Sequence, residues 1–141
     1  MGFWDVSPFG NDDAADFAGD LDEATVEARV ELVGSVLERV AHSTDPDIYD
    51  APRAVAAAAL VAAQRLGGEP TDSGYGPRTP MPQFPGYLGR LAIDALDRVI
   101  ATPSWLADYW DVASQGAEWR RTVADLRNVL DPPQSETLFD L

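Results

Sequence analysis

The stretch Ala54–Ala63 reads Ala-Val-Ala-Ala-Ala-Ala-Leu-Val-Ala-Ala and contains no polar side chain. Because alanine has the highest helix propensity of all residues, this stretch predicts a helix. A helix that is apolar on every side must be covered by other elements, and this one is too short to span a bilayer, which takes about 20 apolar residues. We therefore expect an all-α fold, a single compact bundle of about six helices around this alanine-rich central helix.

The residues on either side of this stretch predict where the central helix begins and ends. Asp50 is expected to cap it, with Pro52 in its first turn, where a missing backbone N–H costs little. Gly67 and Gly68 are expected to end it, because glycine readily adopts the left-handed conformation that follows many helices.

Residues 1–141 are interpreted as one helical domain, which suits the length of the chain. A Gly/Pro-rich loop at 67–86 follows the central helix, and a C-terminal tail occupies 131–141. The loop does not divide the chain into two domains, because neither flank looks able to fold by itself. A loop of this length without secondary structure is often functional.

The N-terminal third of the chain predicts an arm followed by two helices. Residues 1–10 hold three aromatic side chains with proline and glycine, so we expect a non-helical arm that lies on the core. Asn11 is expected to cap the first helix. Asp20 and Glu23 have capping-box spacing, which places the start of a second helix near them and its end near His42. The second helix carries an apolar stripe at three- and four-residue steps: Val26, Val30, Val33, Leu37 and Val40.

Three more helices are predicted after the loop. Residues 87–101 carry an apolar stripe at helical spacing, made of Leu88, Leu91, Ala92, Ala95, Leu96 and Val99. Thr102 and Pro103 predict the start of a fifth helix, with threonine as the cap and proline at the first position. This helix is expected to stop near Gly116, and a sixth is expected from about 117 to 130.

The charge balance is strongly acidic and points to a class of partner. The chain has 24 acidic residues against 10 basic ones, all of them arginine, and a net charge of −14. Such a charge repels nucleic acid and anionic membranes, so we expect neither to be a direct partner. A basic protein is the expected partner, bound with a strength that falls as salt rises.

The absence of cysteine removes disulfides, thiolate metal sites and cysteine nucleophiles together. It also fits a reducing compartment, and the N-terminus lacks the basic and apolar regions of a secretory signal. We therefore expect a cytoplasmic protein.

Acidic side chains recur at helical spacing in the first two predicted helices. We interpret them as the partner-binding residues: Asp12, Asp13, Asp16, Asp20, Glu23, Glu27, Glu31 and Glu38. Glutamates four residues apart repel each other on an isolated helix, which a basic partner would relieve. Two other interpretations stay open: the acids form an ordinary solvated face, or Arg120, Arg121 and Arg127 on the last helix neutralise part of them.

Catalytic and metal-binding patterns are weak. Asn11 and the aspartates that follow it offer oxygen ligands of the kind that Ca²⁺ prefers, but they also suit a helix start with acids at the positive end of its dipole. His42 is the only histidine, which excludes the usual zinc sites, and no serine lies in a recognisable nucleophile elbow. We expect no metal, no cofactor and no catalytic residue.

The opening MGFWDVSPFGNDDAADF resembles a family of small, mainly bacterial proteins that is known as the domain of unknown function DUF4259. The Trp110-Asp111 and Ala117-Glu118-Trp119 regions are also similar, so the resemblance covers most of the chain. The family often has tryptophan where this chain has Phe17. The family has no established activity, so the resemblance implies a structural motif and no catalytic residue. This motif consists of Gly2, Trp4, Pro8, Phe9, Asn11 and Asp12.

These observations lead to one functional expectation and one alternative. The first is a non-enzymatic acidic protein-interaction module of a bacterial cytoplasm, of the immunity, inhibitor or nucleic-acid-mimic type. The alternative is a carboxylate-using enzyme, or a protein that binds a small ligand or a divalent cation, gated by the 67–86 loop. An enclosed cleft beneath that loop would favour the alternative, and a filled core with a one-sided acidic surface would favour the first.

Overall fold

The computed structural model describes residues 2–65, 67–68 and 75–132. These residues form six helices and no strand, apart from an isolated bridge between Phe3 and Asn11. The helices are α1 (Asp12–Glu23), α2 (Val26–Ala41), α3 (Ala51–Ala62), α4 (Tyr87–Ile100), α5 (Trp105–Asp111) and α6 (Gly116–Leu130). The expected all-α bundle is confirmed. Residues 69–74 of the expected loop and residues 133–141 of the expected tail lie outside the described residues.

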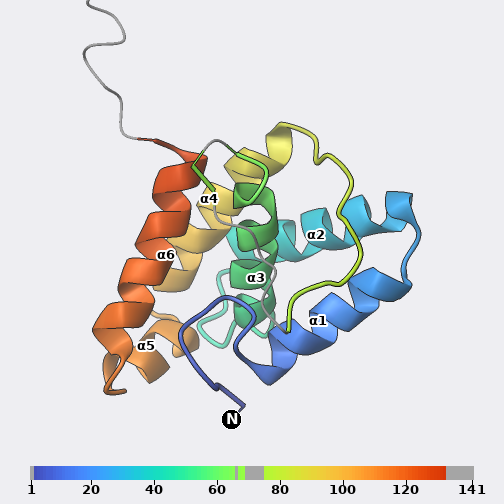
Figure 1. Cartoon of the computed structure of the whole chain (residues 1–141). Helices are drawn as coiled ribbons and strands as arrows, with labels where there is room; N and C mark the ends of the chain where they lie inside the picture. The colour runs from blue at the N-terminus through green and yellow to red at the C-terminus, as the bar shows by residue number, and fades with distance from the viewer. Residues whose placement is uncertain (1, 66, 69–74, 133–141) are drawn as a thin grey trace, which may run out of the picture.

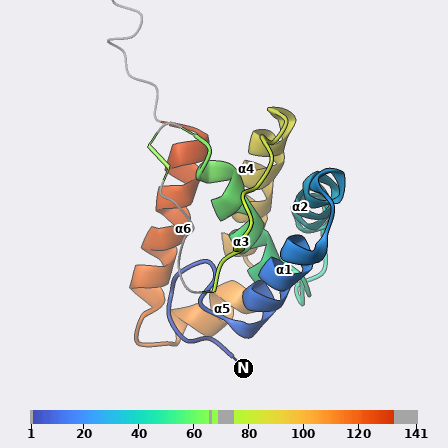
Figure 2. The ribbon, with the colours of Figure 1, turned by 45° about the vertical axis from the view of Figure 1, so that its right-hand side comes forward.

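Helix α3 occupies the centre of the bundle. Figures 1 and 2 show it between α6 on one side and the pair α1 and α2 on the other, and it also contacts α4. Every residue of α3 is buried except Arg53, which is half-buried. Its small alanine side chains allow the surrounding helices to approach closely and still reach interior packing density. The predicted enclosure of the apolar stretch is therefore confirmed.

The predicted boundary between the first two helices is wrong. Helix α1 continues through Gly19 and Asp20 to Glu23, and Thr25 caps α2 by accepting a hydrogen bond from the Ala28 N–H at 3.2 Å. Leu21 is fully buried, which explains why the helix continues past Gly19. Burying a leucine side chain contributes about 1.5–3 kcal/mol, whereas an interior glycine costs about 1 kcal/mol.

The predicted ends of the central helix also need correction. Asp50 precedes α3 but makes no capping hydrogen bond, because its carboxylate accepts from Arg39 Nε at 2.8 Å instead. The helix ends at Ala62, several residues before Gly67, which has a left-handed φ of +87°.

Thr102 and Pro103 do not start the fifth helix. Arg98 holds this segment outside the helix by donating to the carbonyl oxygens of Ala101 and Pro103 at 3.2 and 3.1 Å. Helix α5 begins at Trp105, whose backbone N–H donates to the Pro46 carbonyl at 2.9 Å. The helix ends at Asp111, and Gly116, which was expected to stop it, is the first residue of α6.

The N-terminal arm, residues 2–10, folds back on the bundle as predicted. The Trp4 N–H donates to the Gly10 carbonyl and the Asp12 N–H donates to the Gly2 carbonyl, both at 2.8 Å. A Cβ at Gly2 would lie 1.8 Å from the Asp12 carboxylate, so a larger residue at this position would require the Asp12 side chain to move. The Phe3 ring stacks on Tyr109 of α5 with their centroids 4.9 Å apart. The arm therefore covers an aromatic face of the bundle.

Residues 75–86 form a strap segment that crosses the bundle to the start of α4 (Figure 1). The Asp22 carboxylate accepts hydrogen bonds from the backbone N–H groups of Arg78 and Thr79 at 2.9 and 3.0 Å, and from the Thr79 hydroxyl at 2.8 Å. Gln64 donates to the Pro82 carbonyl at 2.8 Å and accepts from the Phe84 N–H at 3.0 Å. Arg29 and Arg65 donate to the carbonyl oxygens of Pro80 and Gly86 at 3.4 and 3.5 Å, so four side chains hold the strap segment.

Enlarging a side chain on the enclosed helix should destabilise the fold. Ala57 has no exposed surface, so Ala57→Leu forces extra atoms into a packed interior and should lower the free energy of unfolding by about 1–3 kcal/mol. The matched control Ala124→Leu, on the exposed side of α6, should change it by less than about 0.5 kcal/mol. Urea unfolding followed by circular dichroism measures both, and equal stabilities would contradict a filled interior around α3.

Protonation of Asp22 should release the strap segment. Burial raises the pKa of this carboxyl, but hydrogen bonds from Thr79 and Arg78 and the charge of Arg29 together outweigh burial and hold the pKa below its ordinary value. Because the pKa of Asp22 is lower in the folded state, the contact contributes its full stabilisation at pH values above the unfolded-state pKa of about 4. This stabilisation is lost as the pH falls through the folded-state pKa. The amide resonances of Arg78 and Thr79 should therefore shift together, with a midpoint below the ordinary aspartate value.

A protease measures the same contact at neutral pH. Trypsin should cut after Arg78 faster in Asp22→Ala than in the unmodified protein, because the flanking N–H groups lose their acceptor. Asp16→Ala removes an equal charge from the exposed side of α1 and should leave the rate of cutting unchanged. Identical rates in the two variants would show that Asp22 does not hold the strap.

Candidate functional site

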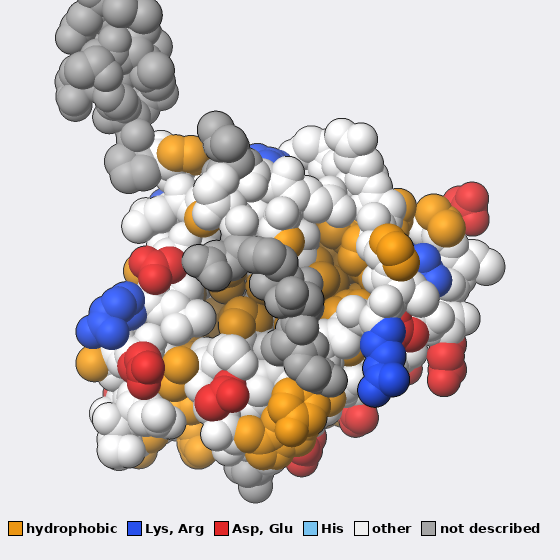
Figure 3. Space-filling view, in the orientation of Figure 1, with side chains coloured by type: hydrophobic (Ala, Val, Ile, Leu, Met, Phe, Trp, Pro, Cys, Tyr) orange, Lys and Arg blue, Asp and Glu red, His pale blue; other side chains and the backbone are white. Residues whose placement is uncertain are grey.

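Four of the predicted partner-binding acids lie along the outer face of α1. Asp12, Asp16, Asp20 and Glu23 are exposed, at steps of three and four residues, which places them on one side of the helix. The opposite side is buried and holds Ala14, Phe17, Ala18 and Leu21. Figure 3 shows acidic side chains along the edge of the molecule where α1 lies. Asp13 differs from the others, since it is half-buried and its Oδ1 lies 3.9 Å from Arg53 Nη1.

The other three acids lie on α2. Glu27, Glu31 and Glu38 are exposed and share a face that points away from the buried side of the helix. That buried side consists of Val33, Val36, Leu37 and Val40. Within the described residues, no arginine lies within 4.0 Å of the carboxylates of these three glutamates or of the four exposed acids on α1.

The arginines of α6 do not neutralise the acids of α2. Arg120 donates to Asp111 at 2.7 and 2.9 Å, and Arg127 donates to Asp97 at 2.6 and 3.2 Å. The hydrogen bond from Arg120 lowers the pKa of the Asp111 carboxyl below its ordinary value. These pairs tie α6 to α5 and α4, so Arg120 and Arg127 do not support the alternative interpretation in which the last helix neutralises part of these acids. Arg121, the third arginine of that interpretation, has no carboxylate within 4.0 Å in the described part of the chain.

A groove of about 480 Å³ runs between α2 and α4, beside the glutamates. Val30 and Leu91 are half-buried in it, and Tyr87 at the start of α4 is 64% exposed. Glu31 and Glu38 contribute from the α2 side. We call this set the α2–α4 groove: Val30, Glu31, Gly34, Ser35, Glu38, Tyr87 and Leu91.

Sequence reasoning placed Val30 and Leu91 among the core residues and did not identify the groove. Both side chains belong to the apolar stripes of their helices but lie at the margin, where burial is incomplete. Val26, assigned to the same stripe, is 52% exposed. The sequence shows that each apolar stripe is wide enough to include residues at its edge. Only the packing of α2 against α4 shows that the edge residues of the two helices face each other.

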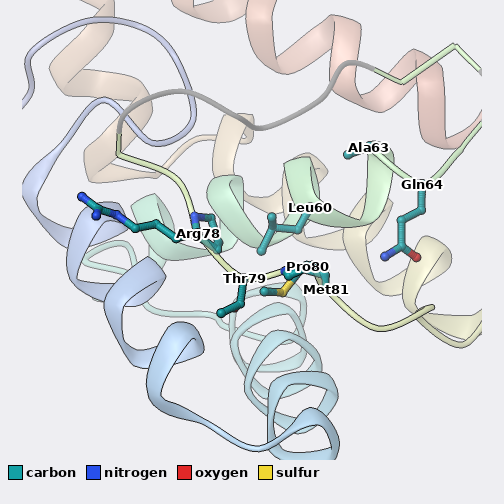
Figure 4. Close-up of a pocket in the computed structure, with 8 residues that line it drawn as sticks. Leu60, Ala63, Gln64, Arg78, Thr79, Pro80 and Met81 are labelled. Atoms are coloured by element: carbon teal, nitrogen blue, oxygen red, sulfur yellow. The ribbon is translucent and has the colours of Figure 1, made fainter.

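A second hollow, of about 340 Å³, lies beside the strap segment (Figure 4). Leu60 points toward Pro80 and Met81, whereas the Arg78 side chain extends away from them. No carboxylate lines this hollow in the described part of the chain. Its described polar side chains are those of Gln64, Arg78 and Thr79.

The acids that follow Asn11 do not converge on a point. Asn11 is buried and uses its Oδ1 to accept from the Ala14 N–H at 2.9 Å, which makes it the cap of α1. No group of three or more histidine, cysteine or acidic side chains in the described ranges is arranged to hold a metal ion. His42 is exposed at the C-terminal end of α2.

None of the helices described here combines the length and the hydropathy that crossing a membrane requires.

Comparison with known proteins identifies the family to which the chain belongs. No curated protein and no solved structure matches the chain. One family profile matches residues 2–122, a range that contains the N-terminal arm, all the predicted partner-binding acids and both sides of the α2–α4 groove. The chain therefore belongs to the family described as domain of unknown function (DUF4259).

Proposed function

We propose that this protein is a non-enzymatic interaction module whose acidic helix faces bind a basic protein. The partner is of the kind that immunity proteins, inhibitors and nucleic-acid mimics bind, with a positively charged surface that the acids cover. As part of the same proposal, the module acts in a bacterial cytoplasm, a reducing compartment that suits a chain without cysteine.

One observation carries the proposal: seven of the eight predicted acids of α1 and α2 have no arginine within 4.0 Å in the described structure. Of the eight predicted residues, only Asp13 lies within 4.0 Å of an arginine in the described structure. The remaining ion pairs of the described residues use Asp50, Asp94, Asp97, Asp111 and Asp131. The two helices therefore keep their negative charge available to a partner.

The spacing of these acids supports the same conclusion. Asp12, Asp16 and Asp20 lie four residues apart on α1, as do Glu27 and Glu31 on α2. Like charges at this spacing destabilise a helix by a few tenths of a kcal/mol for each pair. A basic surface that approaches these faces would turn repulsion into attraction and would accelerate association at low salt.

Charge reversal on α2 should weaken binding. Proteins captured from host lysate by the immobilised chain should be basic and should elute as salt rises. For the captured partner, Glu27→Lys/Glu31→Lys should raise the Kd at least about tenfold, which corresponds to about 1.4 kcal/mol. Isothermal titration calorimetry at low and high salt measures the change.

The matched control is Glu118→Lys/Asp125→Lys, which changes the net charge equally but on the exposed side of α6. It should bind nearly as tightly as the unmodified chain. Binding that ignores salt and is weakened equally by both double variants would overturn the proposal.

A further inference from the structure

We infer that the α2–α4 groove is the docking site for a cationic amphipathic helix of the partner. This inference rests on the proposed function and specifies where binding occurs and what shape of ligand it selects. It follows from the way three apolar or aromatic side chains, Val30, Leu91 and Tyr87, and the carboxylates of Glu31 and Glu38 line the same groove between two helices.

The groove exists because α2 and α4 lie close together and leave their apolar margins uncovered. A Cβ at Gly34 would lie 3.3 Å from Leu88 Cδ2, so the two helices are in close contact along this line. On the outer side of this contact, Val30 from α2 faces Leu91 and Tyr87 from α4. A helix laid into such a groove anchors itself through apolar residues at positions i, i+4 and i+7.

The carboxylates of the α2 wall match a helical ligand in spacing as well as in sign. Glu31 and Glu38 are seven residues apart, which is about 10 Å along a helix. A ligand helix aligned with α2 would bring basic residues seven apart to both glutamates while its apolar face fills the groove. Two contacts of this kind select a helix that combines an apolar stripe with flanking lysine or arginine.

Charge excludes the other occupants of an apolar groove. A second copy of this chain carries a net charge of −14 and would be repelled by the glutamates, as would an anionic membrane. An uncharged apolar helix would remove the carboxylates of Glu31 and Glu38 from water without supplying a positive charge. Burying an unpaired carboxylate costs free energy, so such a helix would bind weakly. On α4 itself, Arg90 pairs with Asp94 at 3.3 Å, so that helix adds no net positive charge.

The test uses two synthetic peptides of leucine and lysine with identical composition. In the stripe peptide, the leucines recur at helical spacing; in the scrambled peptide, they do not form a stripe. Fluorescence anisotropy should show that the stripe peptide binds at least about tenfold more tightly. Changes in the amide resonances of the protein should concentrate at residues 30–38 and 87–91.

A groove-filling variant provides the decisive comparison. Ser35 is exposed and lines the groove, so Ser35→Trp should fill it without disturbing the interior and should weaken the stripe peptide about tenfold. Ala124→Trp adds the same side chain to an exposed position on α6 and should have no effect. Circular dichroism and thermal unfolding verify that both variants fold.

The outcomes separate this inference from the proposed function. Equal binding of the two peptides, unaffected by Ser35→Trp but still abolished by salt, would overturn the groove and leave the acidic faces as a charge-only binding surface. Failure of both peptides to bind would also overturn the groove, while the proposed function is judged separately by the salt dependence of the captured partner.

Discussion

The enclosure of α3 is the constraint on which the other helices depend. A helix with no polar side chain over ten residues gains nothing from contact with water, so its neighbours are held against it by the loss of apolar surface. Because its side chains are mostly alanine, the bundle closes tightly: α4 contacts both α2 and α3, and α6 covers the remaining side. The two hollows described above lie between the margins of α2 and α4 and beside the strap segment.

The arginines serve the interior organisation of the chain more than its surface. Arg98 binds the carbonyl oxygens of Ser43 and Asp45 as well as those before α5, which fixes two connections at once. Arg127 joins α6 to α4 through Asp97, and Arg39 binds Asp50 at the entrance to α3. With several of its few cations engaged in this way, the described structure has little positive charge to set against α1 and α2. The acidity of those helices is therefore a property of the folded surface as well as of the composition.

The sequence predicted those features that depend on residues close together in the chain, and missed those that depend on contacts between distant residues. The central helix followed from Ala54–Ala63 alone, and the shared face of Glu27, Glu31 and Glu38 followed from their spacing. Glu23, expected beside them on the second helix, is instead the last residue of α1. The start of α5 could not be predicted from the local sequence. It is set by hydrogen bonds from Arg98 to the Pro103 carbonyl and from the Trp105 N–H to the Pro46 carbonyl, which join residues far apart in the chain. Thr102 and Pro103 carry the stronger local signal for a helix start, and hydrogen bonds from distant residues override it. The groove was out of reach for the same reason, since it exists only where the margins of two separate helices meet.

Apart from Asp13, the predicted partner-binding acids stand on the sides of α1 and α2 that lie opposite the buried residues. Asp12, Asp16 and Asp20 can each be exchanged without disturbing Phe17 or Leu21, which lie on the other side of the same helix. Folding and surface recognition are thus encoded by different positions of one segment. Substitutions at such outer positions can therefore change the charge pattern that a partner meets while the packing around the alanine-rich centre stays intact.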